Sequence, residues 1–140
     1  MGAAWRQEWN MGQPGIDDDH RATYALVQKF INLPTDDLWR DDGVKLLKEL
    51  RALSVEHFAR EEKVQKAIRF PGAADHHDQH VRLLAMLDEM ISQVDQENAL
   101  FPFAYVKDRA DRLLQFWFLE HFAKSDMQMK PYIAKVLARL

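Results

Sequence analysis

Cysteine is absent from this sequence of 140 residues. Disulfide bonds, cysteine-ligated zinc, cysteine-ligated iron–sulfur clusters and thiol catalysis are therefore excluded. No run of eighteen apolar residues exists either, so we expect no membrane span. An excess of basic residues is also missing, because the formal net charge is −3. The chain thus lacks the excess of positive charge that nucleic-acid binding requires, and we expect no nucleic-acid partner.

Targeting signals are missing as well. The N-terminus has no basic segment followed by an apolar one, as a secretory signal would have, and Arg6 breaks the myristoylation pattern. These absences predict a soluble, cytoplasmic protein, which we expect to be a monomer. A chain of this length suits a single domain, spanning residues 1–140, and its 47% of apolar residues suffices for a packed core.

Glycine and proline are scarce, at five residues each, and most of them separate segments with a helical pattern. Within these segments apolar residues recur every three or four positions, whereas no segment alternates as a strand does. The stripes cover residues 16–31, 46–68, 76–94 and 106–121. Four such helices with short connections predict an all-α protein, an antiparallel up-down-up-down four-helix bundle. A short C-terminal fifth helix, carrying apolar residues 133–140, is expected to pack against its outside or its end.

Polar residues interrupt all four apolar stripes. Five of the six histidines lie in or beside the stripes, together with two carboxylates. The set is His20, His57, Glu61, His76, His80, His121 and Asp126. Burying so many polar groups costs several kcal/mol unless each one finds a partner. A bound metal cluster would partner all of them at once.

The spacing of these residues is suited to metal ligation. His57 and Glu61, like His76 and His80, are four residues apart, which places each pair on one helix face. Asp126 follows His121 by five residues, and in an ideal α-helix it would point about 140° away. It can reach the others only if the helix loosens or ends there.

The number and type of ligands restrict the metal. The set is too large for one tetrahedral zinc ion and too rich in nitrogen for calcium or magnesium. Imidazole suits iron, copper, zinc and nickel. Two iron ions sharing both carboxylates and a bridging oxygen would use the whole set. One ion would be six-coordinate with three histidines, and the other five-coordinate with two histidines and an open position.

The motifs at these residues resemble the haemerythrin family, in particular its bacterial single-domain members, the bacteriohaemerythrins. The matching pieces are Gly12-x-x-x-Ile16-Asp17-x-x-His20, His57-Phe58-x-x-Glu61-Glu62, Pro71-x4-His76-x-x-x-His80 and Trp117-x-x-x-His121-x4-Asp126. Four pieces in this order, which together supply seven ligands, make the resemblance specific, and it extends from about Trp9 to Asp126.

The resemblance implies a function and a role for each ligand. The family binds O2 reversibly at a non-haem di-iron centre with a bridging oxo or hydroxo group. His76, His80 and His121 would hold one iron ion, and His20 and His57 the O2-binding one. Glu61 and Asp126 would bridge the two ions. The implied use is oxygen storage, transport or delivery, with an oxygen-consuming enzyme as a candidate partner.

A dry apolar pocket beside the open position would slow oxidation by water. We expect it to be lined by Phe58, Phe118, Trp117, Leu53 and Tyr24. Phe118 stands where many relatives have leucine, and Val64-Gln65 stands where many have Leu-Met; we interpret the second change as a packing variation. His77 and Glu62 are interpreted as surface residues, although Glu62 is also a candidate for orienting a ligand imidazole.

Three alternative functions use the same residues differently. A module that senses O2, redox state or nitric oxide would need the same site and an output. A di-iron enzyme is less consistent with the sequence, because the Glu-x-x-His pairs of carboxylate-rich oxidases are absent, and we expect no enzymatic activity. A metal-free interaction bundle would leave the buried histidines unexplained.

Overall fold

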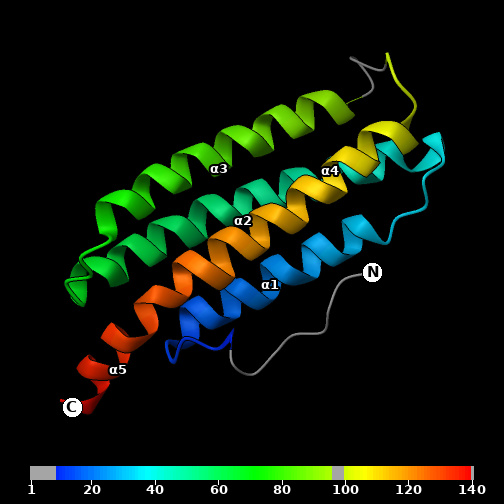
Figure 1. The fold of residues 1–140 in the computed structure, drawn as a ribbon. Helices are drawn as coiled ribbons and strands as arrows, with labels where there is room; N and C mark the ends of the chain where they lie inside the picture. Colours follow the sequence, from blue (N-terminus) through cyan, green and yellow to red (C-terminus); the bar gives the residue numbers. More distant parts are fainter. Residues whose placement is uncertain (1–8, 96–99, 140) are drawn as a thin grey trace.

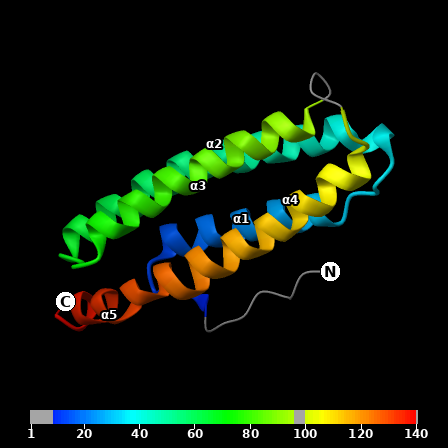
Figure 2. The same ribbon diagram turned by 45° about the horizontal axis from the view of Figure 1, so that its top comes forward.

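The computed structural model describes residues 9–95 and 100–139, and within these residues it contains helices and no strand. Four long helices run alternately up and down (Figures 1 and 2). They are α1 (Pro14–Ile31), α2 (Arg40–Ala67), α3 (Ala73–Val94) and α4 (Phe103–Trp117). A short 3₁₀ turn, η2 (Asp37–Trp39), precedes α2, and the short helix α5 (Lys130–Ala138) ends the described chain. The predicted all-α bundle with a short C-terminal helix is confirmed.

The first helix begins at a well-defined cap. Pro14 occupies its first turn, where the missing N–H costs nothing. The Gln13 side chain accepts a hydrogen bond from the Ile16 backbone N–H at 2.7 Å, and Asp17 Oδ2 accepts one from Gly12 at 3.2 Å. Gly12 has a φ of +88°, a conformation that glycine adopts without strain. The cap fixes the register of α1 and therefore the direction of the residues one turn later.

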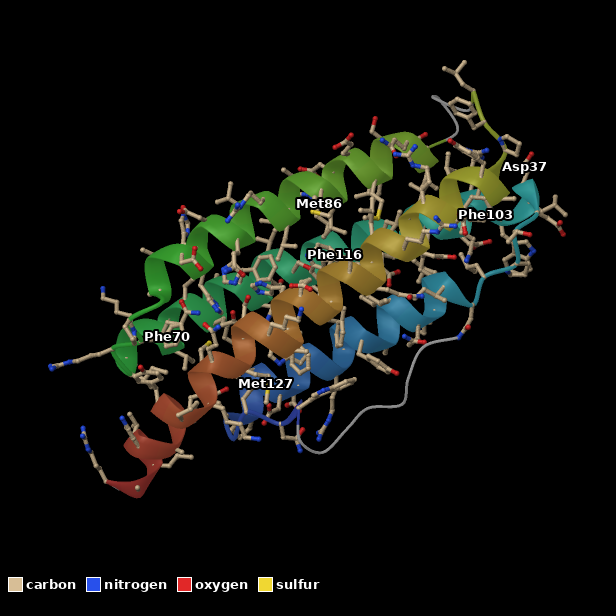
Figure 3. All side chains as sticks on the ribbon, in the orientation of Figure 1. Asp37, Phe70, Met86, Phe103, Phe116 and Met127 are labelled. Carbon is tan, nitrogen blue, oxygen red and sulfur yellow. The ribbon has the colours of Figure 1, made fainter. Side chains whose placement is uncertain are left out.

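Two apolar clusters fill the bundle, one toward each end. The larger extends from Phe58, Trp117 and Phe118 to Phe103 at the end where α4 begins. The smaller comprises Met11, Ile16, Phe70, Met129 and Ile133, so it includes the contact with α5. Figure 3 labels Phe70 and Phe103, which lie at opposite ends of the molecule. The predicted ligands lie along the helices between these two clusters.

The last helix of the bundle changes its winding where the site begins. After Trp117 the chain continues as the π-helix η4 (Phe118–Ser125), then as the 3₁₀ turn η5 (Asp126–Met129), and then as α5. In a π-helix the hydrogen bond joins residues five apart. The backbone N–H of Asp126 accordingly donates to the carbonyl of His121. The predicted loosening of the helix between His121 and Asp126 is therefore present.

Candidate metal centre

All seven predicted ligands come together in one buried cluster, and each is 6% exposed or less. Every helix of the bundle contributes to it. The residues are His20 from α1, His57 and Glu61 from α2, His76 and His80 from α3, His121 from η4 and Asp126 from η5. The regular period of α1, α2 and α3 suffices to direct the first five inward.

Asp126 joins the cluster because of the π-helix. Five residues of α-helix would turn it away from His121. In the wider turn of η4 the two residues lie one above the other. His121 Nε2 and Asp126 Oδ1 are 2.9 Å apart as a result.

Each carboxylate presents one oxygen to each side of the cluster. Glu61 Oε2 lies 3.0 Å from His57 Nε2 and 3.5 Å from His20 Nε2. Its other oxygen, Oε1, lies 3.1 Å from His80 Nε2 and 3.9 Å from His121 Nε2.

Asp126 repeats this division. Its Oδ2 is 3.2 Å from His20 Nε2, whereas Oδ1 faces His121. The two carboxylates therefore stand between His20 and His57 on one side and His80 and His121 on the other, and His76 lies nearest the oxygens of the second side.

Two sets of side-chain atoms are compact enough to hold a cation each. They are His20, His57, Glu61 and Asp126, and Glu61, His80, His121 and Asp126, with the ligand atoms of each set within 4.8 Å of one another.

Among the described residues, four of these buried atoms have no partner in hydrogen-bond geometry, although they lie close to one another in two pairs, His57 Nε2 with Glu61 Oε2 and His121 Nε2 with Asp126 Oδ1. Such atoms are costly to bury unless something binds them. Because imidazole and carboxylate are also the right donor types, the cluster fits a transition-metal site.

His76 lies slightly apart from these two sets. Its Nδ1 is 3.5 Å from Glu61 Oε1 and 3.6 Å from Asp126 Oδ1. The other ring nitrogen, Nε2, donates to the Ser125 carbonyl at 2.9 Å. This bond fixes the ring so that Nδ1 faces the carboxylates.

Polar side chains behind the cluster hold several of the imidazoles in place. Asp19 Oδ2 accepts from His57 Nδ1 at 3.2 Å, and the carboxylate is in turn held by Arg60 at 2.7 and 3.2 Å. Glu62 Oε2 accepts from His80 Nδ1 at 2.8 Å. Such partners fix the tautomer and orientation of a metal-binding histidine.

The structure supports one alternative raised by the sequence and corrects one interpretation. Glu62 orients His80 through one oxygen and contacts the exposed His77 through the other, at 2.8 Å, so it is more than a solvated charge. Gln65 is fully buried with its amide nitrogen 2.8 Å from His76 Nδ1; the change at this position is therefore not a packing variation. The sequence feature that indicates this contact is the spacing of Gln65, four residues after Glu61 on the same helix face.

The electrostatics of the cluster favour a protonated His57. Burial lowers the pKa of His57, but its contacts with Asp19 and Glu61 outweigh this and raise the pKa to about 10. Burial raises the pKa of Glu61, but the surrounding imidazoles hold it well below its usual value. A proton on His57 thus compensates part of the carboxylate charge, and metal binding at this residue must displace it.

A small cavity of about 10 Å³ lies beside the two-histidine side of the cluster. Among the described residues, four of the predicted ligands line it: His20, His57, His121 and Asp126. The rest of the lining consists of the aromatic side chains of Phe58, Trp117, Phe118 and Phe122 and the hydroxyl-bearing side chain of Thr23. A space of this size accommodates about one water-sized molecule.

The lining only partly coincides with the residues predicted for the pocket. Phe58, Trp117 and Phe118 line the cavity. Leu53 and Tyr24 are not among its lining residues; Tyr24 packs behind Phe118, with ring centroids 5.4 Å apart. Phe122 and Thr23, the third residue after His20, line the cavity instead.

The sequence comparisons agree with this geometry. The family described as "Hemerythrin HHE cation binding domain" matches residues 12–133, which include all seven clustered residues. The chain belongs to the hemerythrin family. A relative named Bacteriohemerythrin, from Clostridium acetobutylicum, is 22% identical over 128 residues, which cover 89% of this chain and 95% of the relative.

No helix among the described residues has the length and apolarity needed to cross a bilayer. The family match over residues 12–133 includes the whole cluster, whose residues extend from α1 to η5.

Proposed function

We propose that this protein binds O2 reversibly at a pair of non-haem iron ions, for oxygen storage or delivery. The observation that carries the proposal is the division of the buried cluster into two histidines and three histidines around two shared carboxylates. When bound, ferrous iron supplies the electrons that hold O2 and recovers them when O2 leaves.

Each residue of the cluster has a distinct role under this proposal. His20 and His57 would hold one ion, and His76, His80 and His121 would hold the other. Glu61 and Asp126 would be shared between the two, since each points one oxygen to either side. The side with fewer histidines would leave room for a ligand.

The position of the cavity supports this assignment. It is lined by both His20 and His57, whereas His121 is the one member of the other histidine group among its lining residues. Phe58 and Phe118 close it with apolar surface and keep water out. Exclusion of water favours release of the ligand as neutral O2 over irreversible oxidation.

The proposal is tested by iron content and optical spectroscopy together. The protein is expected to bind two iron ions per chain and to develop a visible absorption band in air that disappears when O2 is removed, over repeated cycles. His57→Ala should lose iron, whereas His77→Ala, which removes a solvent-exposed histidine, should retain it. Fewer than two ions per chain, or a spectral change that O2 removal does not reverse, would contradict the proposal.

A further inference from the structure

The cavity beside His20 and His57 contains one hydroxyl that the proposed metal site does not use. It belongs to Thr23, which is 5% exposed and lies on α1 three residues after His20, on the same helix face. Thr23 Oγ1 has no hydrogen-bond partner among the described residues. A buried hydroxyl without a hydrogen-bond partner in the protein indicates that a bound molecule supplies one.

A buried hydroxyl within a helix usually satisfies itself. Serine and threonine commonly donate to the backbone carbonyl four residues earlier. Ser54, equally buried on α2, does so by donating to the Leu50 carbonyl at 2.7 Å. Thr23 makes no corresponding bond to the carbonyl of Asp19. Its hydroxyl is therefore left free to donate to a molecule in the cavity.

The other polar groups of the cavity are already committed. His20, His57, His121 and Asp126 are the proposed ligands, and the rest of the wall is aromatic. Trp117 also has an unpartnered ring nitrogen, but this side chain lies between the cavity and a second, open groove of about 410 Å³. Thr23 is thus the hydroxyl that faces the ligand position.

We propose that Thr23 is a specificity-determining residue of the ligand pocket, whose hydroxyl donates a hydrogen bond to the small molecule held there. This inference rests on the proposed function, because it assumes that the cavity receives the ligand. A hydroxyl both donates and accepts. It therefore stabilises a diatomic ligand that acquires negative charge, and it slows the departure of that ligand.

The test compares Thr23→Val, which removes the hydroxyl and keeps the shape, with wild type. Iron-loaded protein in air is mixed with an oxygen scavenger, and the rate at which the visible band decays is measured. Thr23→Val is expected to lose O2 about three- to tenfold faster, the effect of one lost hydrogen bond. Thr23→Ser should restore part of the difference. Ser54→Ala, which removes a hydroxyl outside the cavity, should leave the rate unchanged.

A second measurement separates ligand binding from a structural role. Thermal unfolding of the metal-free protein should show Thr23→Val to be no less stable than wild type, because its hydroxyl has no partner to lose. Ser54→Ala should be less stable, because it loses a made bond. Clear destabilisation of metal-free Thr23→Val, or reduced iron content, would show a structural role and overturn the inference.

The two proposals fail in different ways. Reversible O2 binding by wild type with an unchanged rate in Thr23→Val would overturn the role of Thr23 alone. Wild-type protein without a reversible band would overturn the proposed function and this inference with it.

Discussion

Replacement of Phe118 by leucine tests how the aromatic wall of the cavity contributes to both stability and ligand exchange. Phe118 is 6% exposed and contacts three other rings: Trp9, Tyr24 and Phe122, with centroids 6.0, 5.4 and 5.0 Å away. Each well-placed aromatic pair contributes about 0.5–1.5 kcal/mol beyond its buried area. Neighbouring contacts are not fully additive.

The expected magnitude follows from these contacts. Leucine keeps part of the buried area but loses the ring pairs and leaves a small void. We therefore expect Phe118→Leu to destabilise the protein by about 2–3 kcal/mol. For a chain of this length that corresponds to a melting temperature lower by about 6–10 °C. The enlarged cavity should also admit small ligands faster.

Two assays check these expectations on the same variant. Urea unfolding measures the stability, and the rate at which azide binds the ferric protein measures access to the site. Phe116→Leu is the matched control, because Phe116 is 59% exposed and precedes Phe118 by only two residues; it should change stability by less than about 0.5 kcal/mol. A destabilised Phe118→Leu variant with unchanged azide binding would refute the assignment of Phe118 as a wall of the ligand path.

Three further predictions concern the metal-free cluster and the packing of the bundle. The pKa of His57 is raised from 6.5 to about 10, so its contribution to the stability of the metal-free protein is complete below pH 6.5 and is lost as the pH rises towards 10. Metal binding at pH 7 should therefore release protons, which calorimetry in buffers of different ionisation enthalpy can measure. Lys107→Met should cost about 2–3 kcal/mol in urea unfolding, since it leaves half-buried Asp111 and the Ile31 carbonyl without the donor that each contacts at 2.8 Å. Gly43→Ala should lower stability by about 1 kcal/mol in the same assay, because a Cβ would lie 3.0 Å from Phe103 and the clash exceeds the gain in helix propensity.

The sequence predicts the bundle and the cluster well because both depend on the helical period. His57 and Glu61 are four residues apart, as are His76 and His80, so any α-helix that buries one residue of a pair also buries the other. When several helices each bury such polar residues in one core, these residues meet in a shared site. The structure brings all of them together, each at most 6% exposed.

Residues at the edge of each stripe are less predictable. Tyr24 and Thr23 follow His20 by four and three residues, and both positions lie near the same face. A rotation of α1 by a few tens of degrees decides which of them faces the cavity. That rotation is set by contacts between helices, such as Asp19 with Arg60 and His57, which local sequence does not reveal.

The five-residue spacing between His121 and Asp126 links the fold to the site. A π-helix has poorer backbone geometry than an α-helix, and one that persists in a fold needs compensation from other contacts. Here the compensation comes from Asp126, which reaches His121 with one oxygen and His20 on α1 with the other. In a regular α-helix Asp126 would turn away, and the cluster would keep a single carboxylate between its two groups of histidines. The same distortion that places the second carboxylate in the cluster therefore also sets the direction in which the chain leaves the bundle toward α5.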